Sequence, residues 1–251
     1  MVEAGPGLAV VVVLLVAIAV LAVRATGLPL GRAVVTAAGR AVVQLAVVSA
    51  VLVVLLGSMP LTLLYVAFMA GVATVTCARR TGTDVRRPWV AVPIVAGAAP
   101  VVALVLASGV VPWEPSAVLP IAGILIGNAM TATTLAVKRM TDELQGRLGE
   151  YEAGLSLGLL PRTAVLEVAR PSAELALVPD LDKTRTVGLV TLPGAFVGVL
   201  LGGGSAVEAG AAQLLVLIGI LAAQAVCVLV TVQLVGARRA LPDALRTRLV
   251  A

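Results

Sequence analysis

Long apolar runs separated by short polar breaks dominate this chain. The runs fall at about 7–23, 41–57, 61–78, 89–111, 117–137, 187–203 and 211–235. Most of them approach the roughly 20 residues that a helix needs to cross the hydrocarbon core of a bilayer, and the breaks carry turn residues or charge. The pattern predicts an all-α fold, a polytopic transmembrane helical bundle of about seven spans.

The basic residues predict how these spans are oriented. If the spans alternate, all 18 Lys and Arg residues fall on one side of the membrane, and the other side carries acidic residues only. Because cytoplasmic loops are rich in Lys and Arg, we expect the N-terminus outside and the C-terminus in the cytoplasm. The first span has no basic region before it and no convincing cleavage site, so we expect it to be a retained helix.

The composition excludes several classes of protein. Hydrophobic residues make up 60% of the chain and charged residues 12%, whereas soluble globular proteins average about 25% charged residues. The absence of histidine rules out His-based triads and zincin sites, and no P-loop for ATP occurs. We therefore expect no catalytic residue, no nucleotide site and no nucleic-acid partner, and we interpret the net charge of +5 as the charge that orients the helices. Cys77 and Cys227 are expected to be buried small side chains.

One long loop, 138–186, stands out within the single predicted transmembrane domain, 1–251. Its apolar residues recur every three or four positions, as on one face of an amphipathic helix. They are Met140, Leu144, Leu148, Tyr151, Leu155 and Leu159. This pattern fits either a connector at the membrane interface or a docking surface for a cytoplasmic partner, and it does not choose between them.

Local signals within this loop give more specific expectations. Glu143 and Arg147 are spaced for an i,i+4 ion pair, and Gly158 and Pro161 predict the end of the helix. The carboxylates of Asp180 and Asp182 are expected to be solvated.

Polar residues inside the spans are costly in lipid, so they either bond to neighbouring helices or line a path through the membrane. The residues that we consider for a translocation path are Gln44, Asn128, Met130, Thr131 and Thr134. Glutamines at 213, 224 and 233 belong to the same polar class. The residues assign no ligand set for a metal.

Glycines at four-residue spacing predict close helix packing, either within the chain or between two copies. They are Gly123 and Gly127 in the fifth span and Gly194, Gly198 and Gly202 in the sixth.

Two stretches carry a family resemblance. IGNAMTATTLAVKRMTDELQGRLGEYEAGLSLGLLPRTAV and LVPDLDKTRTVGLVTLPGAFVGVLLGG resemble the iron-export and aluminium-tolerance family of ABC transporter permeases (FetB-type), with a likeness over about residues 30–235. The resemblance implies a homodimeric, multi-pass subunit of the bacterial plasma membrane that exports iron or a related metal ion. It also implies a separate cytoplasmic ATP-binding subunit, which would hold ATP and Mg.

ABC permeases present a cytoplasmic E-A-A-x-x-x-G element to that ATPase. Here it reads EAGLSLG, with Glu152, Ala153 and Gly158 matching and Gly154 in place of the second alanine. The resemblance implies that this segment, with Leu155 and Leu159, couples to the ATPase.

Three other functions remain open at this point. An ATP-independent channel or a secondary transporter would usually need an ionisable residue deep in a span, and none is evident in the predicted spans. A structural membrane subunit is the third alternative.

Overall fold

The computed structural model describes residues 5–249. Where the sequence predicts a single domain, these residues form two compact units, one up to Ser58 and one from Met59 onward. The first unit is a hairpin of two contacting helices, α1 (Pro6–Ala25) and α2 (Gly31–Leu55). Gly27, with a φ of 72°, forms the turn between them, because glycine adopts this backbone region without a steric penalty.

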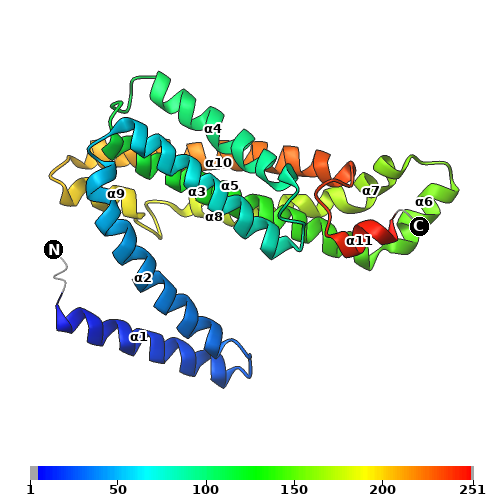
Figure 1. Cartoon of the computed structure of the whole chain (residues 1–251), viewed down its shortest axis with the longest axis horizontal. Coiled ribbons are helices and arrows are strands. Elements are labelled where there is room, and N and C mark those ends of the chain that lie inside the picture. Colours follow the sequence, from blue (N-terminus) through cyan, green and yellow to red (C-terminus); the bar gives the residue numbers. More distant parts are fainter. Residues whose placement is uncertain (1–4, 250–251) are drawn as a thin grey trace. The chain divides into compact units, whose positions relative to one another are not determined.

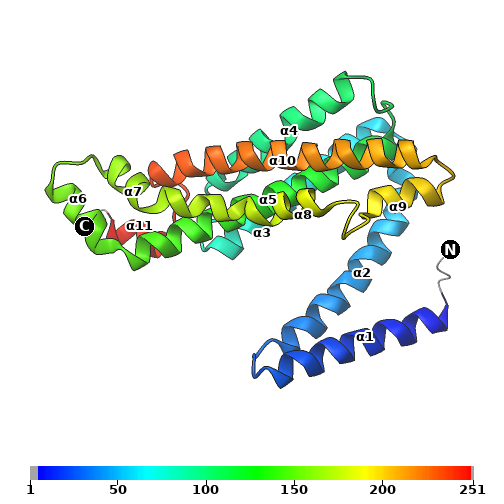
Figure 2. The same cartoon turned by 180° about the vertical axis from the view of Figure 1, so that it is seen from behind.

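The second unit is built around α5 (Pro115–Gly146). This helix contacts α3 (Met59–Thr81), α4 (Ala91–Ala107) and α10 (Ala206–Gly236), and α5 and α10 lie side by side in both cartoon views (Figures 1 and 2). A short 3-10 turn, η1 (Pro88–Val90), precedes α4. The buried face of α5 is rich in alanine, which lets its neighbours approach closely. These fully buried alanines are Ala122, Ala129, Ala132 and Ala136.

Local signals define where α10 begins. The Ser205 hydroxyl accepts a hydrogen bond from the Glu208 backbone N–H (3.2 Å), and the Glu208 carboxylate accepts one from the Ser205 N–H (2.8 Å). This reciprocal pair is a capping box, which satisfies N–H groups that have no partner within the helix. Helix α11 (Asp243–Arg248) follows the end of α10, and its Leu245 is buried.

The chain returns from the end of α5 to the beginning of α10 through four short helices in place of one long helix. They are α6 (Leu148–Ser156), α7 (Pro161–Ala169), α8 (Val178–Thr186) and α9 (Gly194–Leu201), with the 3-10 segment η2 (Arg170–Ala176) between α7 and α8. From α7 onward this segment runs along α5 and α10 (Figure 2), with η2 against α5 and α9 against α10.

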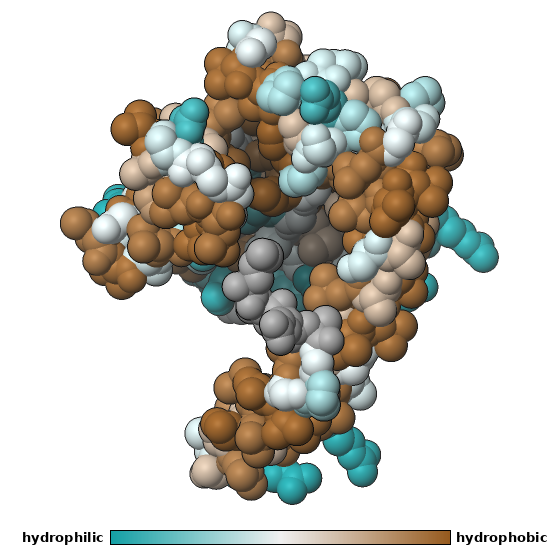
Figure 3. Space-filling model, turned by 90° about the vertical axis from the view of Figure 1, so that its left-hand side faces the viewer, coloured by the Kyte–Doolittle hydropathy of each residue, from teal (hydrophilic) through white to brown (hydrophobic). Residues whose placement is uncertain are grey.

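The predicted helical membrane bundle is confirmed. Within the described residues, five helices are long and apolar enough to cross a membrane: α1, α2, α3, α5 and α10. The fourth predicted span is the 17-residue α4. In the end-on view of Figure 3, hydrophobic residues cover most of the flanks of the helices, as expected of surfaces that face lipid.

The sixth predicted span, 187–203, is wrong as a continuous helix. Only the eight residues of α9 are helical there, because Gly188 (φ 79°) and Pro193 interrupt the run and both residues disfavour a helix interior. Between them, Val187 and Thr191 form an isolated β-bridge. The sixth passage along the bundle is therefore made by residues 161–201, and it is discontinuous.

The predicted loop 138–186 is corrected by the same finding. Residues 138–146 continue α5, and 161–186 pack along the bundle, so the segment around α6 and the turn to α7 is what remains at its end. The amphipathic stripe is confirmed from Met140 to Leu155, since Met140, Leu144 and Tyr151 are buried, with Leu148 and Leu155 partly so, whereas Leu159 is exposed. The stripe does not lie on one helix, because α5 ends at Gly146 and α6 begins at Leu148.

Gly97 lies at a tight contact between α4 and α10. A Cβ at this position would lie 2.3 Å from Cys227 Sγ and 2.4 Å from the backbone oxygen of Ala223, so only glycine fits. Both Cys77 and Cys227 are buried free thiols, as predicted.

We predict that Gly97→Ala lowers the free energy of unfolding in detergent by about 1–3 kcal/mol, the usual cost of overpacking. Gly210→Ala on α10 is the matched control, because nothing lies within 4 Å of a Cβ there and alanine is the better helix former. Denaturant titration of both variants, followed by circular dichroism, measures the difference. Equal stability of the two variants would show that the α4–α10 crossing can relax.

Candidate functional site

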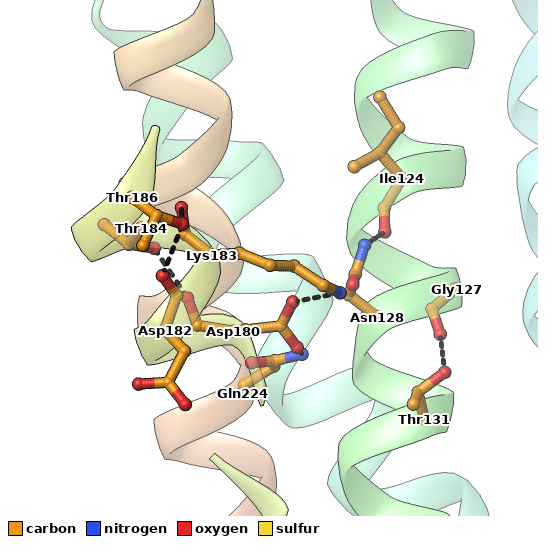
Figure 4. A network of polar contacts seen from close by, with 10 residues as sticks. All are labelled: Ile124, Gly127, Asn128, Thr131, Asp180, Asp182, Lys183, Thr184, Thr186 and Gln224. Carbon is orange, nitrogen blue, oxygen red and sulfur yellow. Dashed lines mark hydrogen bonds and ion pairs between the residues drawn. The ribbon is translucent and has the colours of Figure 1, made fainter. Parts of the chain in front are cut away.

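A buried carboxylate, Asp180, lies on the discontinuous sixth passage. The residue is 9% exposed, and both of its carboxylate oxygens accept hydrogen bonds (Figure 4). Gln224 Nε2 of α10 donates to Oδ2 at 2.6 Å, and Lys183 Nζ, one turn further along α8, donates to Oδ1 at 2.9 Å. Thr184 Oγ1 also donates to the Asp180 backbone oxygen at 2.7 Å.

Gln224 is fully buried and only half satisfied. Its Nε2 is used by Asp180, whereas its Oε1 has no hydrogen-bond partner among the described residues. A buried amide oxygen without a partner is costly, and in native proteins such an atom often marks a functional position.

This polar cluster lies deep within the bundle. Gln224 is near the middle of α10, which has 31 residues and so is about 46 Å long at 1.5 Å per residue. Asn128, near the middle of the 32-residue α5, lies across from Lys183 in Figure 4. Because the hydrocarbon core is about 30 Å thick, the middle of these helices falls well inside it.

Two expectations from the sequence are therefore wrong. Asp180 is not solvated, although Asp182 is, and an ionisable residue does lie deep in the sixth passage. The physical reason is that α8 turns Asp180 toward α10, where Gln224 supplies a donor. A signal was present in the sequence, since VPDLDKTRT places four charged residues directly before an apolar run broken by Gly188 and Pro193.

Two basic side chains of α8 are largely exposed. The side chains of Lys183 and Arg185 are 67% and 74% exposed, and Arg185 pairs with Asp182 at 3.4 Å. Charged groups at this depth are too costly to face lipid tails, so they face water or protein. Broken helices are tolerated in membranes under the same condition, where they line a cavity or are covered by protein.

The predicted path residues divide into three places. Asn128 and Thr131 lie one turn apart on α5, donating to the Ile124 oxygen (2.8 Å) and the Gly127 oxygen (3.0 Å) of their own helix. Thr134 is buried and donates to Cys77 Sγ of α3 at 3.2 Å.

The remaining two path residues are Met130 and Gln44. Met130 packs against the core, and Gln44 is exposed on α2 of the first unit. In Figure 4 the α8 cluster extends toward Asn128, whereas Thr131 points to the other side of α5. Thr134 and Met130 contribute to the packing of the bundle.

The predicted packing glycines behave differently from one another. A Cβ at Gly123 would lie 3.1 Å from Met69 Cε, so this glycine does permit the close approach of α3 and α5. Gly127, Gly194 and Gly198 have nothing within 4 Å, and a Cβ at Gly202 would meet only carbonyl oxygens of α9. Within the described chain, the α9 glycines therefore mark no helix crossing.

A groove lies between α3 and α4, with α5 as its floor. Its volume is about 1040 Å³, and apart from Thr74 and Arg86 its lining is apolar. Such a surface offers few ligands for a charged cargo, which leaves the α8 cluster as the stronger candidate. Among residues 5–249, no three His, Cys, Asp or Glu side chains come together as a metal site.

The EAGLSLG segment lies on α6 and the turn that follows it. Glu152 and Ala153 are exposed on α6, and Gly158 adopts a φ of 87° in the turn. A Cβ at Gly154 would lie 3.2 Å from Leu159 Cδ1 and 3.5 Å from Ala164 Cβ of α7, so glycine here allows α6 and α7 to form a tight hairpin. Leu155 is partly buried against the core.

Arg147 fixes the junction between α5 and α6. It donates to Glu143 at 2.9 Å, which confirms the predicted i,i+4 pair, and to Glu150 on α6. The hydrogen bond from Arg147 holds the pKa of the Glu150 carboxyl below its ordinary value. A lowered pKa means that the stabilisation is present above the ordinary pKa and is lost as the pH falls through the folded-state value, so the junction is fully paired at neutral pH.

These features define a class of protein: a multi-pass helical membrane protein with a charged, discontinuous passage at mid-depth. The family follows from comparison. A model described as an uncharacterised protein family (UPF0014) matches residues 7–239, and the chain belongs to this family. The predicted resemblance to the FetB-type family is confirmed, because the relatives carry those names.

Three relatives illustrate the similarity. UPF0014 membrane protein STAR2 of Oryza sativa subsp. japonica is 38% identical over 184 residues, 72% of this chain and 65% of that protein. Protein ALUMINUM SENSITIVE 3 of Arabidopsis thaliana is 38% identical over 151 residues, 60% of this chain and 55% of that protein. The probable iron export permease protein FetB of Escherichia coli (strain K12) is 32% identical over 207 residues, 81% and 80% of the two chains.

The chain thus spans less than two thirds of the two plant relatives. No solved structure matches it significantly.

We predict that a cysteine at Arg185 reacts with a charged, water-soluble thiol reagent in membranes, because the exposed face of α8 meets water. Leu229→Cys on α10 is the matched control: its side chain is also exposed, but it projects from an apolar helix and should not react. The buried native cysteines give little background. Equal labelling at both positions would contradict an aqueous environment specific to α8.

Proposed function

We infer that this protein is the membrane-spanning permease subunit of an ABC transporter that exports iron or a related metal ion across the plasma membrane of a bacterium. Two copies would work with a separate cytoplasmic ATPase, which would carry ATP and Mg. The name of the Escherichia coli relative, a probable iron export permease, supports the transported class. The α6–α7 hairpin lies near the C-terminal ends of α5 and α10. This position supports a cytoplasmic location for the hairpin, because the C-terminus is expected in the cytoplasm.

The observation that carries this proposal is the α6–α7 hairpin. Leu157 and Leu160, in its turn, are 86% and 72% exposed, at the end of the bundle rather than along its lipid-facing length (Figure 1). Large apolar side chains in a tight turn, flanked by the exposed Glu152, suit insertion into a partner's surface pocket.

The hairpin is also firmly attached to the rest of the bundle. Arg162 on α7 donates to Gln233 on α10, and Leu166 packs against Gly236, where a Cβ would lie 2.9 Å from its side chain. A force on the hairpin would therefore be passed to α7 and α10 rather than absorbed by a loose loop.

One observation favours a second candidate, an ion-gradient-driven secondary transporter. Asp180 and Lys183 are ionisable residues deep in the sixth passage, and proton or ion relays use such residues. The requirement for ATP separates the two functions. In proteoliposomes, export that needs the partner ATPase and ATP supports the ABC permease, whereas export driven by an ion gradient alone supports the alternative.

We predict that Leu157→Ser combined with Leu160→Ser abolishes the stimulation of the partner ATPase and weakens its copurification at least tenfold, because two exposed apolar anchors are lost. Glu152→Lys should reduce the stimulation through its charge. The matched control is Gln145→Ser, an exposed residue in the last turn of α5, which should behave as the unmodified protein. ATP hydrolysis by the reconstituted complex measures the effect. Unchanged hydrolysis in the double variant would rule out the hairpin as the coupling element.

A further inference from the structure

We propose that Asp180 is the ligand of a cation-binding site at mid-depth, and that the Lys183 ammonium group occupies this site when it is empty. The inference rests on the proposed function only for the choice of a divalent metal ion as cargo. Its structural basis is the carboxylate that α8 buries against α10, together with the unpartnered amide oxygen beside it.

The bonding of Asp180 shows what the site can hold. Each carboxylate oxygen accepts one hydrogen bond, from Lys183 Nζ (2.9 Å) and from Gln224 Nε2 (2.6 Å). The Lys183 ammonium group thus already places a positive charge next to the Asp180 carboxylate. A metal ion would take the same position, because its attraction to a carboxylate in a low-dielectric environment far exceeds that in water.

Lys183 is able to leave, whereas Asp180 is not. The Lys183 side chain is two-thirds exposed and projects from α8 on a flexible stem, so rotation about its bonds moves the ammonium group into the aqueous space beside α8. Asp180 is fixed by its burial against α10 and by the bond from Thr184 Oγ1 to its backbone oxygen. The exchange is thus one cation replacing another at a fixed anion.

Gln224 is suited to both states. With Lys183 in place, its Nε2 donates to Asp180 and its Oε1 stays without a partner. If the amide rotates by about 180°, Oε1 is directed to the position next to the carboxylate and becomes a second oxygen ligand. The amide oxygen that is unsatisfied in the empty site would thereby be satisfied in the loaded one.

The donor set points to a class of metal. The ligands are a carboxylate and an amide oxygen, and Asn128, across from Lys183, adds a further amide oxygen (Figure 4). Carboxylate, carbonyl and water ligands suit hard divalent cations such as Mn²⁺, whereas soft ions prefer thiolate or imidazole. The chain has no histidine, and the two cysteines are engaged elsewhere, with Thr134 and with the Pro93 oxygen.

The test measures Mn²⁺ binding to the full chain, in complex with its partner ATPase in lipid nanodiscs and without nucleotide, from the loss of the free-Mn²⁺ electron paramagnetic resonance signal. Asp180→Asn should weaken binding at least tenfold. Lys183→Met should tighten it at least tenfold, because the competing ammonium group is gone. Asp182→Asn is the matched control, an exposed aspartate two residues away that pairs with Arg185, and it should bind as the unmodified chain does.

A purely structural ion pair gives a different pattern. Both Asp180→Asn and Lys183→Met would then destabilise the bundle, and neither would change Mn²⁺ affinity. Should Lys183→Met fail to fold, Lys183→Gln keeps a hydrogen-bond donor beside Asp180 without the competing charge, so it should also tighten binding at least tenfold. Unaltered affinity in Asp180→Asn, or no Mn²⁺ binding by the unmodified chain, overturns the proposal.

Failure of the proposed function would look different. ATP hydrolysis by the same complex is recorded in parallel: a permease that fails to stimulate the ATPase contradicts the ABC assignment, whatever the Mn²⁺ affinities. Conversely, normal stimulation with no effect of Asp180→Asn on binding removes the site and leaves the permease assignment standing.

Discussion

The hydrogen bond between Gln224 and Asp180 is the interaction on which the sixth passage of this bundle depends. A carboxylate in the middle of a membrane bundle is tolerated only with partners, and here α10 provides one by placing an amide at its own midpoint. That pairing holds the nine-residue α8 against α10. It also explains why a segment with four charges lies along the bundle instead of protruding from it as a loop.

The break after α8 follows from the same constraint. A continuous helix from Pro161 to Leu201 would have to carry the charges of α8 and the glycine and proline residues that follow on one rigid axis. Gly188, in the left-handed region, and Pro193 interrupt the helix. The chain can therefore change direction, so that α9 presents an apolar surface near the beginning of α10. The discontinuity therefore separates a polar stretch, which needs protein or water, from an apolar one, which tolerates lipid.

The sequence predicts the long apolar helices well, because a run of about 20 apolar residues has few alternatives in a membrane. It also predicts the Glu143–Arg147 pair and the turn at Gly158, since both depend on neighbours in the chain. The burial of Asp180 depends instead on a residue 44 positions away, and nothing local distinguishes Asp180 from the exposed Asp182. The prediction from the basic residues fails for a related reason. It assigns all of them to loops on one side of the membrane, whereas Lys183 and Arg185 lie along the bundle.

The proposed coupling hairpin and the proposed cation site belong to one continuous segment. Movement of the hairpin can therefore reach the cation site directly along the chain. From Gly158 to Asp180 the chain is helical or nearly so, and it is attached to α10 at Gln233 and Gly236 near one end and at Gln224 further along. A displacement of the hairpin would therefore move α7, η2 and α8 together and load their contacts with α10. The Asp180–Gln224 contact is one of the bonds that such a displacement would strain, because a side-chain hydrogen bond tolerates little change in distance. Loosening it would uncover the carboxylate, which is the change that a cation site must undergo to take up or release its ion.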